Sequence, residues 1–424
     1  MIQRFFRAEL DRPSGEVARR HLHEERALPA WAVDEEAFGY VPEGRTRVVD
    51  AAVAAGVPLE VCAEAGLVKR SDAALRRAFR RTERREPTDG DDLVRFWRSH
   101  CEGRAEFYYD YPVLVTSAGE YRWGDWLTIP IHVRDDEGRR RIGGFQYRSM
   151  RPLSEIGKEG RYRSPRPSAA ISWPQTLIGL AGEDEQIARS GWAVICEGKF
   201  DQTALKVAVR DLPAEMRPGV IALGGVSTRG HAASDDPIAR AGVLGQIGAG
   251  FVTFCTDGDV SGLDAVLRLG PLLVALGTKV SAARIQDVWD RMPAGMVQPK
   301  DPGEVLARLG AQALREMLAQ GRTRDLGRFA SELLEDRLAA LTRSGQLWRR
   351  LIALDHVLPA LRAVPGASRG DAIRRTALAA GLPLAVVECA VDESAIRSRE
   401  TALVGPHVAG RDVGGVSPLK RPMS

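Results

Sequence analysis

The chain has 424 residues with 60 basic and 56 acidic side chains, so its formal net charge of +4 is too small to indicate a class of partner. This length allows about two to four domains with a sizeable core. The five cysteines form no Cys-x-x-Cys pair, and the chain shows neither a signal peptide nor a membrane-spanning apolar run, so we expect a cytoplasmic protein without zinc, disulfides or membrane contact.

The N-terminal part, residues 1–185, mixes helix and strand patterns. Apolar and charged residues alternate at helical spacing over 15–35, and Pro29 predicts a break between two short helices. Further helices are predicted over 48–55 and 59–65, the second of which ends at a glycine, as helices often do. This part therefore begins as a set of short helices.

Two basic segments and a hairpin follow. Six arginines between positions 76 and 85 fit either a solvated helix face or a nucleic-acid contact. Strands are predicted over 126–133 and 141–147, joined by an Asp-Asp-Glu-Gly turn, and a short helix is predicted near 175–181. From position 139 to 166, nine basic residues outnumber two acids, and this net charge of +7 favours a polyanionic partner.

Strands then alternate with helices, which predicts a parallel sheet with right-handed crossovers. The predicted strands cover 193–197, 219–223, 251–256 and 279–285, and the helices between them cover 201–209, 236–247 and 262–276. From about 304 to 398 nearly every segment has a helical pattern, and the residues after 400 are rich in Gly and Pro and predict a flexible tail.

Acidic side chains follow two of these strands at the points where the strands end. The acids concerned are Glu197, Asp201, Asp257 and Asp259, with Asp301 after a further strand. Because the carboxyl ends of parallel strands meet at one edge of a sheet, we expect these carboxylates to converge there. They would repel one another without a cation, and Mg²⁺ prefers oxygen ligands. The sequence therefore predicts a site for Mg²⁺ or Mn²⁺.

Two neighbouring features have simpler interpretations. The Gly-Lys pair at Lys199 is not a phosphate-binding P-loop, because the first glycine of that motif is absent and Phe200 stands where Ser or Thr is needed. Cys196 and Cys255 directly precede the acidic turns, and we interpret them as buried packing residues.

In this order the acidic motifs resemble a Toprim domain, the metal-binding fold of DnaG-type bacterial primases, topoisomerases and some nucleases. Segments further upstream are similar, in order, to the N-terminal half of the DnaG-type primase catalytic core. They are Phe38-Gly39-Tyr40-Val41-Pro42, Ala65-Gly66-Leu67, Ile129-Pro130-Ile131, Gly144-Phe145-x-x-Arg148 and Arg161-Tyr162-x-Ser164-Pro165. The motif order covers roughly residues 15–310.

The resemblance implies an α/β protein with three subdomains. An N-terminal α+β subdomain with a basic nucleic-acid-binding ridge would cover 1–185, and a Toprim-type parallel α/β catalytic domain would cover 186–310. A helical subdomain would cover 311–400, followed by a flexible tail over 401–424.

The implied activity is that of a DNA primase, which makes short RNA primers from nucleoside triphosphates on a single-stranded DNA template by two-metal-ion nucleotidyl transfer. Glu197, Asp257 and Asp259 would be the catalytic acids, and Asp201 and Asp301 would complete the set that holds Mg²⁺ or Mn²⁺. Glu197 is also the candidate general base for the primer hydroxyl.

The ridge of the family implies nucleic-acid and nucleotide contacts for Arg148, Arg161, Tyr162 and Arg163, and Lys199 adds a positive charge beside the acids. The aromatic residues interleaved with these cations were expected to stack on bases: Phe145, Tyr147 and Tyr162.

The chain departs from the family pattern in two ways that bear on function. It has no Cys/His set for the family's zinc ribbon, so a replicative helicase or a separate template-recognition protein is an expected partner. Gly303 stands where the family has a second aspartate after Asp-Pro, which would weaken one metal position or pass it to Glu304.

Two other functions compete with a primase. The same acids could serve a metal-dependent nuclease, or the chain could be a catalytically weak DNA-binding accessory module of replication. A type IA topoisomerase is disfavoured, because it needs a tyrosine after the Toprim domain and every tyrosine here precedes it.

Overall fold

The protein is described by a computed structural model that divides into two compact units, Met1–Asp325 and Leu326–Ser424. The described residues are 2–42, 72–88, 124–134, 137–156, 178–224, 237–289, 295–341 and 347–392, with short pieces within 52–70, 92–122, 161–163 and at 292. The tail predicted over 401–424 lies outside them, as do most residues of the helices predicted over 48–55 and 59–65. Each unit is described by itself.

Short helices open the first unit. α1 (Ile2–Asp11) leads through the 3₁₀ turn η1 (Pro13–Gly15) into α2 (Glu16–Arg20), the π-helical turn η2 (His21–Glu25) and α3 (Ala30–Glu35). Pro29 is extended and directly precedes α3, because its ring suits the start of a helix and not the interior. This confirms the predicted break between two short helices.

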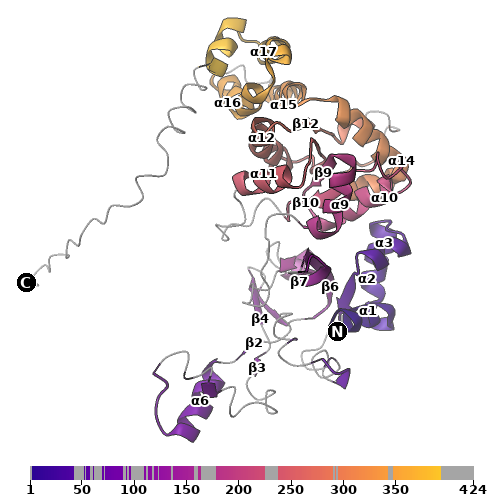
Figure 1. Ribbon diagram of the computed structural model, residues 1–424, viewed down its shortest axis with the longest axis vertical. Coiled ribbons are helices and arrows are strands. Elements are labelled where there is room, and N and C mark those ends of the chain that lie inside the picture. Colours follow the sequence, from indigo (N-terminus) through magenta and orange to yellow (C-terminus); the bar gives the residue numbers. More distant parts are fainter. Residues whose placement is uncertain are drawn as a thin grey trace, which may run out of the picture. The chain divides into compact units, whose positions relative to one another are not determined.

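An antiparallel sheet with the order β1-β6-β7-β8 follows (Figure 1). Its strands are β1 (Gly39–Val41), β6 (Trp126–Arg134), β7 (Arg140–Ser149) and β8 (Tyr162–Arg163). The long β6/β7 hairpin confirms the predicted pair of strands. α1 crosses β1 so closely that a Cβ at Gly39 would lie 2.6 Å from Cβ of Phe6, so only glycine fits at this position.

Smaller elements lie between β1 and β6 in the chain and after β7. The helices are α6 (Asp72–Glu83) and α8 (Leu153–Ile156). Two strand pairs are formed by β2 (Lys69–Arg70) with β3 (Tyr109–Asp110) and by β4 (Val113–Thr116) with β5 (Gly119–Arg122).

The second sheet is fully parallel, with the order β10-β9-β11-β12, as the alternation of strands and helices predicted. Its strands are β9 (Trp192–Cys196), β10 (Gly219–Ala222), β11 (Phe251–Phe254) and β12 (Lys279–Ala282). The helices around it are α9 (Leu180–Ser190), α10 (Lys199–Val209), α11 (Pro237–Gln246), α12 (Val260–Ala275), α13 (Gln286–Trp289) and α14 (Pro302–Thr323).

Helix α9 differs from the sequence prediction. A short helix was expected near 175–181, of which 175–177 lie outside the described residues, but Ile178 forms a β-bridge with Ala222 and the helix begins only after Gly179. It then continues to Ser190 through the polar segment Gly-Glu-Asp-Glu. Its buried residues are Ala181, Glu183 and Ile187, and one acid among three buried positions interrupts the apolar periodicity by which a helix is predicted from sequence.

One hydrophobic core joins the two sheets of the first unit. Phe38, next to β1, stacks on Phe200 of α10 with ring centroids 5.7 Å apart, and both side chains are buried. The same cluster contains Leu127 and Ile129 of β6 and Val194 of β9. The N-terminal helices and the antiparallel sheet are therefore held against the parallel sheet by continuous apolar packing.

The second unit is helical throughout its described part, as the pattern after residue 304 predicted. It contains α15 (Leu326–Leu341), α16 (Leu347–Ala363) and α17 (Gly366–Ala380). Ser331 of α15 and Thr376 of α17 are buried and hydrogen-bonded to each other at 3.0 Å. In the described segments of both units, no helix combines the length and apolar character that crossing a lipid bilayer requires.

Candidate active site

The predicted acids lie where the strands of the parallel sheet end. Glu197 directly follows β9, and Asp257 lies three residues after the end of β11. These strands pair in parallel, with Ile195 opposite Phe254, so both acids leave the same edge of the sheet. Asp259 begins α12, where its carboxylate accepts a hydrogen bond from the backbone N–H of Gly262 at 2.9 Å. Local structure therefore places these three acids at the same edge of the parallel sheet.

Two further acids accept hydrogen bonds from backbone N–H groups at the start of α14. Asp201, buried in the first turn of α10, accepts a hydrogen bond from the backbone N–H of Gly303 at 3.1 Å. Asp301 is the N-cap of α14 and accepts from the backbone N–H of Glu304 at 2.6 Å. Both carboxylates are thereby fixed beside the strand ends by the start of α14.

The carboxylates are close enough to perturb one another strongly. Burial, followed by the carboxylates of Asp201 and Glu197, raises the pKa of Asp257 to about 9. Burial, followed by the Asp301 carboxylate, raises the pKa of Asp201 to about 7. Such shifts arise when several acids converge in a poorly solvated place with too little positive charge nearby.

The donor set fits a hard divalent cation. Oδ1 of Asp257 is buried and accepts no hydrogen bond, so it is available to a ligand. All five groups are carboxylates, which Mg²⁺ and Mn²⁺ prefer, and a cation would relieve their repulsion. Among the described residues, no group of three or more Asp, Glu, His or Cys side chains lies close enough together to hold a metal ion as it stands.

Arg26 joins this site, although no sequence pattern singled it out. Its Nη1 lies 3.4 Å from each carboxylate oxygen of Asp301, and its guanidinium lies 5.2 Å from the ring centroid of Phe200. Burial alone would lower the pKa of Arg26, but Asp301 and Asp201 raise it. Arg26 is the residue after the π-helical turn η2, and it precedes Ala27, whose positive φ of 51° turns the chain sharply. In the sequence it is one arginine among many in a charged segment.

Two of the arginines expected in the basic ridge lie close together. Arg148 and Arg161 line one pocket of about 150 Å³ together with His21, Glu25 and Arg151. The guanidinium of Arg161 lies 5.9 Å from the ring of Tyr162, whose side chain is 41% exposed. The backbone of Arg163 pairs with β7, but its side chain lies outside the described part.

Arg148 is more deeply placed than a surface cation. Burial lowers its pKa, and its guanidinium lies 5.7 Å from the ring of Phe200. Arg26 and Arg148 therefore lie near the same ring, which connects the pocket to the acidic site. An anion bound here would meet guanidinium groups at both places.

Known proteins resemble this arrangement at the level of the fold. A scan of protein families finds no match. A DNA primase of Myxococcus xanthus is 29% identical to this chain over 239 residues. The match covers 56% of this chain and 33% of that primase, so the chain spans about a third of the length of its curated relative. The RNA polymerase domain of Mycobacterium tuberculosis primase DnaG, in complex with double-stranded DNA carrying a 6-nucleotide overhang, matches with a TM-score of 0.54 at 18% identity, over 90% of this chain and 95% of that one.

The chain has the fold of a DnaG primase catalytic core. A DNA primase domain from Pseudomonas aeruginosa matches equally broadly, with a TM-score of 0.52 at 16% identity over 92% of this chain and 97% of that one. These likenesses confirm the predicted α/β fold class.

Two aromatic residues of the predicted ridge are wrong as base-stacking residues. Phe145 is 4% exposed and Tyr147 is fully buried, and both pack against Phe6 of α1. Successive residues of a strand point to opposite faces, so Phe145 and Tyr147, which are two residues apart, share the core face of β7. Only Tyr162 remains available at the surface.

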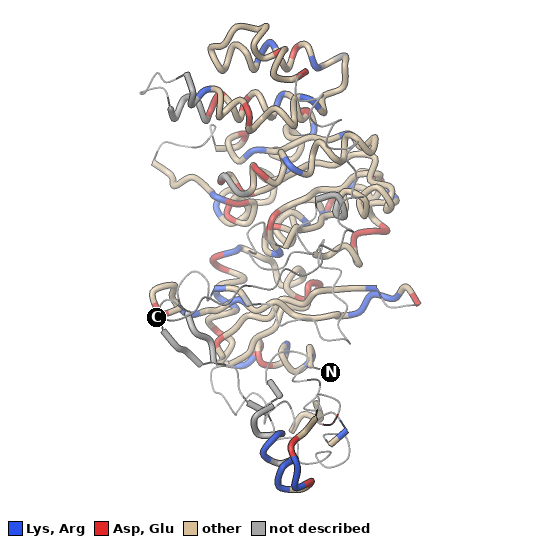
Figure 2. Tube along the Cα trace, turned by 90° about the vertical axis from the view of Figure 1, so that its left-hand side faces the viewer, with Lys and Arg blue, Asp and Glu red and all other residues tan. Residues whose placement is uncertain are grey.

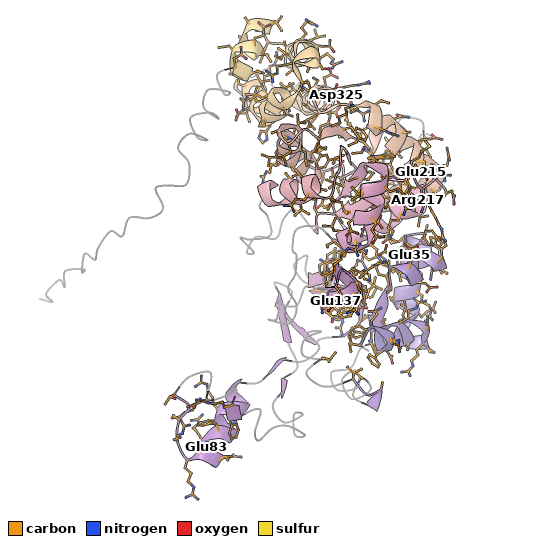
Figure 3. All side chains as sticks on the ribbon, in the orientation of Figure 1. Glu35, Glu83, Glu137, Glu215, Arg217 and Asp325 are labelled. Atoms are coloured by element: carbon orange, nitrogen blue, oxygen red, sulfur yellow. The ribbon has the colours of Figure 1, made fainter. Side chains whose placement is uncertain are left out.

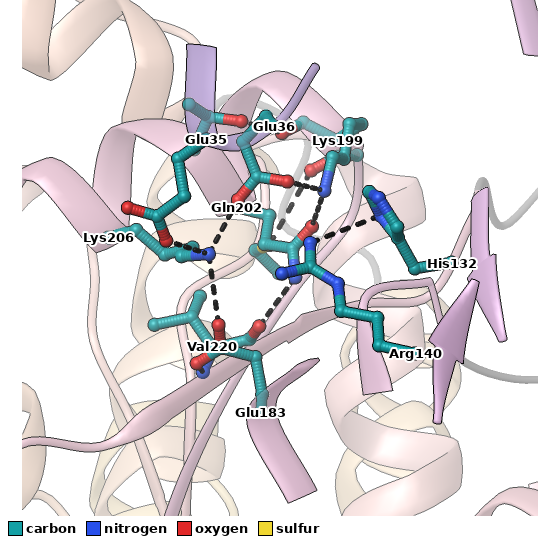
Figure 4. A network of polar contacts seen from close by, with 12 residues as sticks. Glu35, Glu36, His132, Arg140, Glu183, Lys199, Gln202, Lys206 and Val220 are labelled. Carbon is teal, nitrogen blue, oxygen red and sulfur yellow. Dashed lines mark hydrogen bonds and ion pairs between the residues drawn. The ribbon is translucent and has the colours of Figure 1, made fainter. Parts of the chain in front are cut away.

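Lys199 is also wrong as a nucleotide-binding residue. Its side chain is 2% exposed, and its ammonium group forms an ion pair with Glu36 and donates to Oε1 of Gln202 at 2.8 Å (Figure 4). It begins α10, and its side chain is directed into the interface with α3. The positive charge expected beside the acids is therefore used within the core of the primase-like fold.

A buried ionic network surrounds this pair, as Figure 4 shows. Glu36 also accepts from Lys206 at 2.6 Å, and Lys206 lies 3.1 Å from Glu35 and 3.0 Å from Glu183. The two lysines hold the pKa of Glu36 far below its usual value in spite of its burial. The network ties the N-terminal helices to α9 and α10, next to the acidic edge.

The absence of a side chain at Gly303 leaves room for Arg26 and Asp201. A Cβ there would lie 2.9 Å from Nη1 of Arg26 and 3.3 Å from Oδ1 of Asp201, so a side chain would displace both. Glu304, considered above as a substitute ligand, accepts from the backbone N–H of Lys300 at 3.1 Å and pairs with Arg308 at 3.1 Å. Its carboxylate is therefore already engaged at the start of α14.

Proposed function

We propose that this chain is the catalytic core of a DNA primase, which joins ribonucleoside triphosphates into short RNA on a single-stranded DNA template. The observation that carries the proposal is the convergence of five carboxylates and Arg26 at the carboxyl edge of the parallel sheet. The primase fold and the curated primase relative support the same activity. Such an enzyme of replication would act in the cytoplasm.

Glu197, Asp257 and Asp259 would hold Mg²⁺ or Mn²⁺, with Asp201 and Asp301 in support. When bound, such an ion would stabilise the charge that develops on the transferred phosphate and favour deprotonation of the attacking hydroxyl. Glu197 is the candidate to accept that proton. Arg26 would hold Asp301 in position and offer its remaining N–H groups to an incoming phosphate.

The template and the triphosphate would approach across the basic side of the N-terminal subdomain. Arg148 and Arg161 supply cations at the pocket, and Tyr162 supplies the exposed ring on which a base can stack. Arg163 is proposed with them from its place in β8. A helicase or a template-recognition protein would complete the system.

Primer synthesis by the full chain tests the proposal. Protein, a single-stranded template and Mn²⁺ are incubated with either NTPs or dNTPs, and labelled products are resolved on a gel. We expect short RNA from the wild type and a loss of more than about 100-fold in Asp257→Asn, because a buried ligand oxygen is removed. Undiminished product from this variant would refute the site.

The matched control is Asp211→Asn, which removes an exposed carboxylate whose ion pair is with Arg315 on the surface. It should synthesise primers at the wild-type rate. Metal-dependent cleavage of the template without NTPs would instead identify a nuclease, and salt-dependent DNA binding without turnover would identify an accessory module.

A further inference from the structure

Helix α6 (Asp72–Glu83) has two chemically different sides. Its Phe79 is buried, 2% exposed, and packs against Phe96 with ring centroids 5.3 Å apart. The exposed side carries Arg76, Arg77, Arg80 and Arg81, which at about 100° per residue fall within an arc of about 140° that is centred about 130° from Phe79. All four side chains are exposed, as is Arg84 just after the helix.

A small anchor holds this helix in place. Arg85 lies over the ring of Phe79 at 4.8 Å and pairs with the buried Asp92 at 2.8 Å. Asp92 also accepts from the backbone N–H of Thr88 at 2.9 Å and from its hydroxyl at 2.7 Å. The turn after α6 is thus tied back to the segment that carries Phe96, and the arginine side is left facing outward.

Little acidic charge compensates this surface. Arg80 pairs with Glu86 at 3.2 Å, and both side chains are at least half exposed. Within the described part of the chain, no carboxylate pairs with the remaining four, which are Arg76, Arg77, Arg81 and Arg84. Figure 2 shows basic residues in blue along α6, near the bottom of the view, and Figure 3 marks Glu83 at the end of the same helix.

Like charges three or four residues apart weaken a helix unless anions lie between them. A helix that lies on an acidic membrane combines basic with exposed apolar side chains, and the described side chains of α6 include no exposed large apolar residue beside the arginines. A phosphate backbone needs only cations at regular spacing, and arginine rows repeating about every 6 Å supply them.

We propose that this outward side of α6, with Arg84, is a second DNA-contacting surface that binds the phosphate backbone without reading sequence. The choice of DNA over an acidic protein rests on the proposed function. The contact adds affinity for the template independently of the acidic site, because phosphate contacts position nucleic acid and do not specify bases.

Fluorescence anisotropy with labelled single-stranded and duplex DNA, over about 50 to 200 mM salt, tests this directly. The test variant changes Arg76, Arg77, Arg81 and Arg84 together to Gln. The slope of log affinity against log salt should fall by up to about 2.8 for single strands or about 3.6 for duplex, and the Kd at 100 mM salt should rise at least about tenfold. The same four positions changed to Lys should keep the slope.

Three controls make the result decisive. A variant with Arg4, Arg189, Arg268 and Arg374 changed to Gln lowers the net charge equally elsewhere and should bind like the wild type. Equal affinity and slope in both Gln variants would overturn the proposal, as would tighter binding to anionic phosphatidylserine vesicles than to DNA. Asp257→Asn should keep the α6-dependent binding, so a failure of primer synthesis and a failure of this contact are distinguishable.

Discussion

Replacement of Glu36 by glutamine should be the most destabilising single change at the junction between the N-terminal helices and α10. Glu36 is 2% exposed and lies between the ammonium groups of Lys199 and Lys206. Glutamine keeps the size of the side chain and removes its charge. After the change Lys199 loses its carboxylate partner and keeps its hydrogen bond to Oε1 of Gln202, whereas Lys206 retains the carboxylates of Glu35 and Glu183.

The magnitude follows from this asymmetry. Leaving one member of a buried ion pair without its partner costs about 3–5 kcal/mol of unfolding free energy. Glu36→Gln should reach this range, because Lys199 is completely enclosed and burial already lowers its pKa. Lys199→Met should cost less, because Glu36 would still be paired with Lys206. The double variant should cost less than the sum of the two, because neither partner is then left alone.

Urea unfolding at pH 7.5, followed by circular dichroism and tryptophan fluorescence, measures these free energies. The matched control is Glu35→Gln, whose side chain is 47% exposed and lies 3.1 Å from the same Lys206. It should cost less than about 1 kcal/mol. A cost below about 1 kcal/mol for Glu36→Gln, or strict additivity in the double variant, would refute the assignment of a buried, coupled network.

Three further results are expected. Arg26→Ala should lower kcat/KM for primer synthesis by about 100-fold with Tm nearly unchanged, because Asp301 loses the guanidinium that pairs with it, and kinetics with Arg26→Lys should show partial recovery. In thermal melts, Mn²⁺ should raise the Tm of the wild type but not of Asp257→Asn, since metal binds only the folded form. Burial, followed by Arg140, lowers the pKa of His132 to about 3, so the folded protein keeps this ring neutral while the unfolded chain protonates it below about pH 6.5. The contribution of the neutral ring to the free energy of unfolding should therefore be fully present above pH 6.5 and be lost as the pH falls towards 3. In unfolding titrations, His132→Gln should remove about one proton from this pH dependence.

The local sequence pattern determined several strands and helix starts of this protein. Short apolar runs ending in acidic turns predicted β9 and β11, and the chain order then placed Glu197 and Asp257 at one edge, because parallel strands end on the same side. The N-capping roles of Asp259 and Asp301 are likewise local, since each carboxylate accepts from a backbone N–H three residues later. These features depend on neighbours in sequence.

Tertiary packing decided the rest. Lys199 adjoins the acidic motif in sequence, yet it is paired with Glu36, which lies 163 residues away. Arg26 reaches Asp301 across 275 residues, and Tyr147 is buried under α1 although Arg148 directly follows it. A sequence shows which side chains carry charge, but whether a charge meets solvent, a ligand or a buried partner depends on which elements pack together. For this reason the acids could be predicted from the sequence, whereas their cationic neighbours could not.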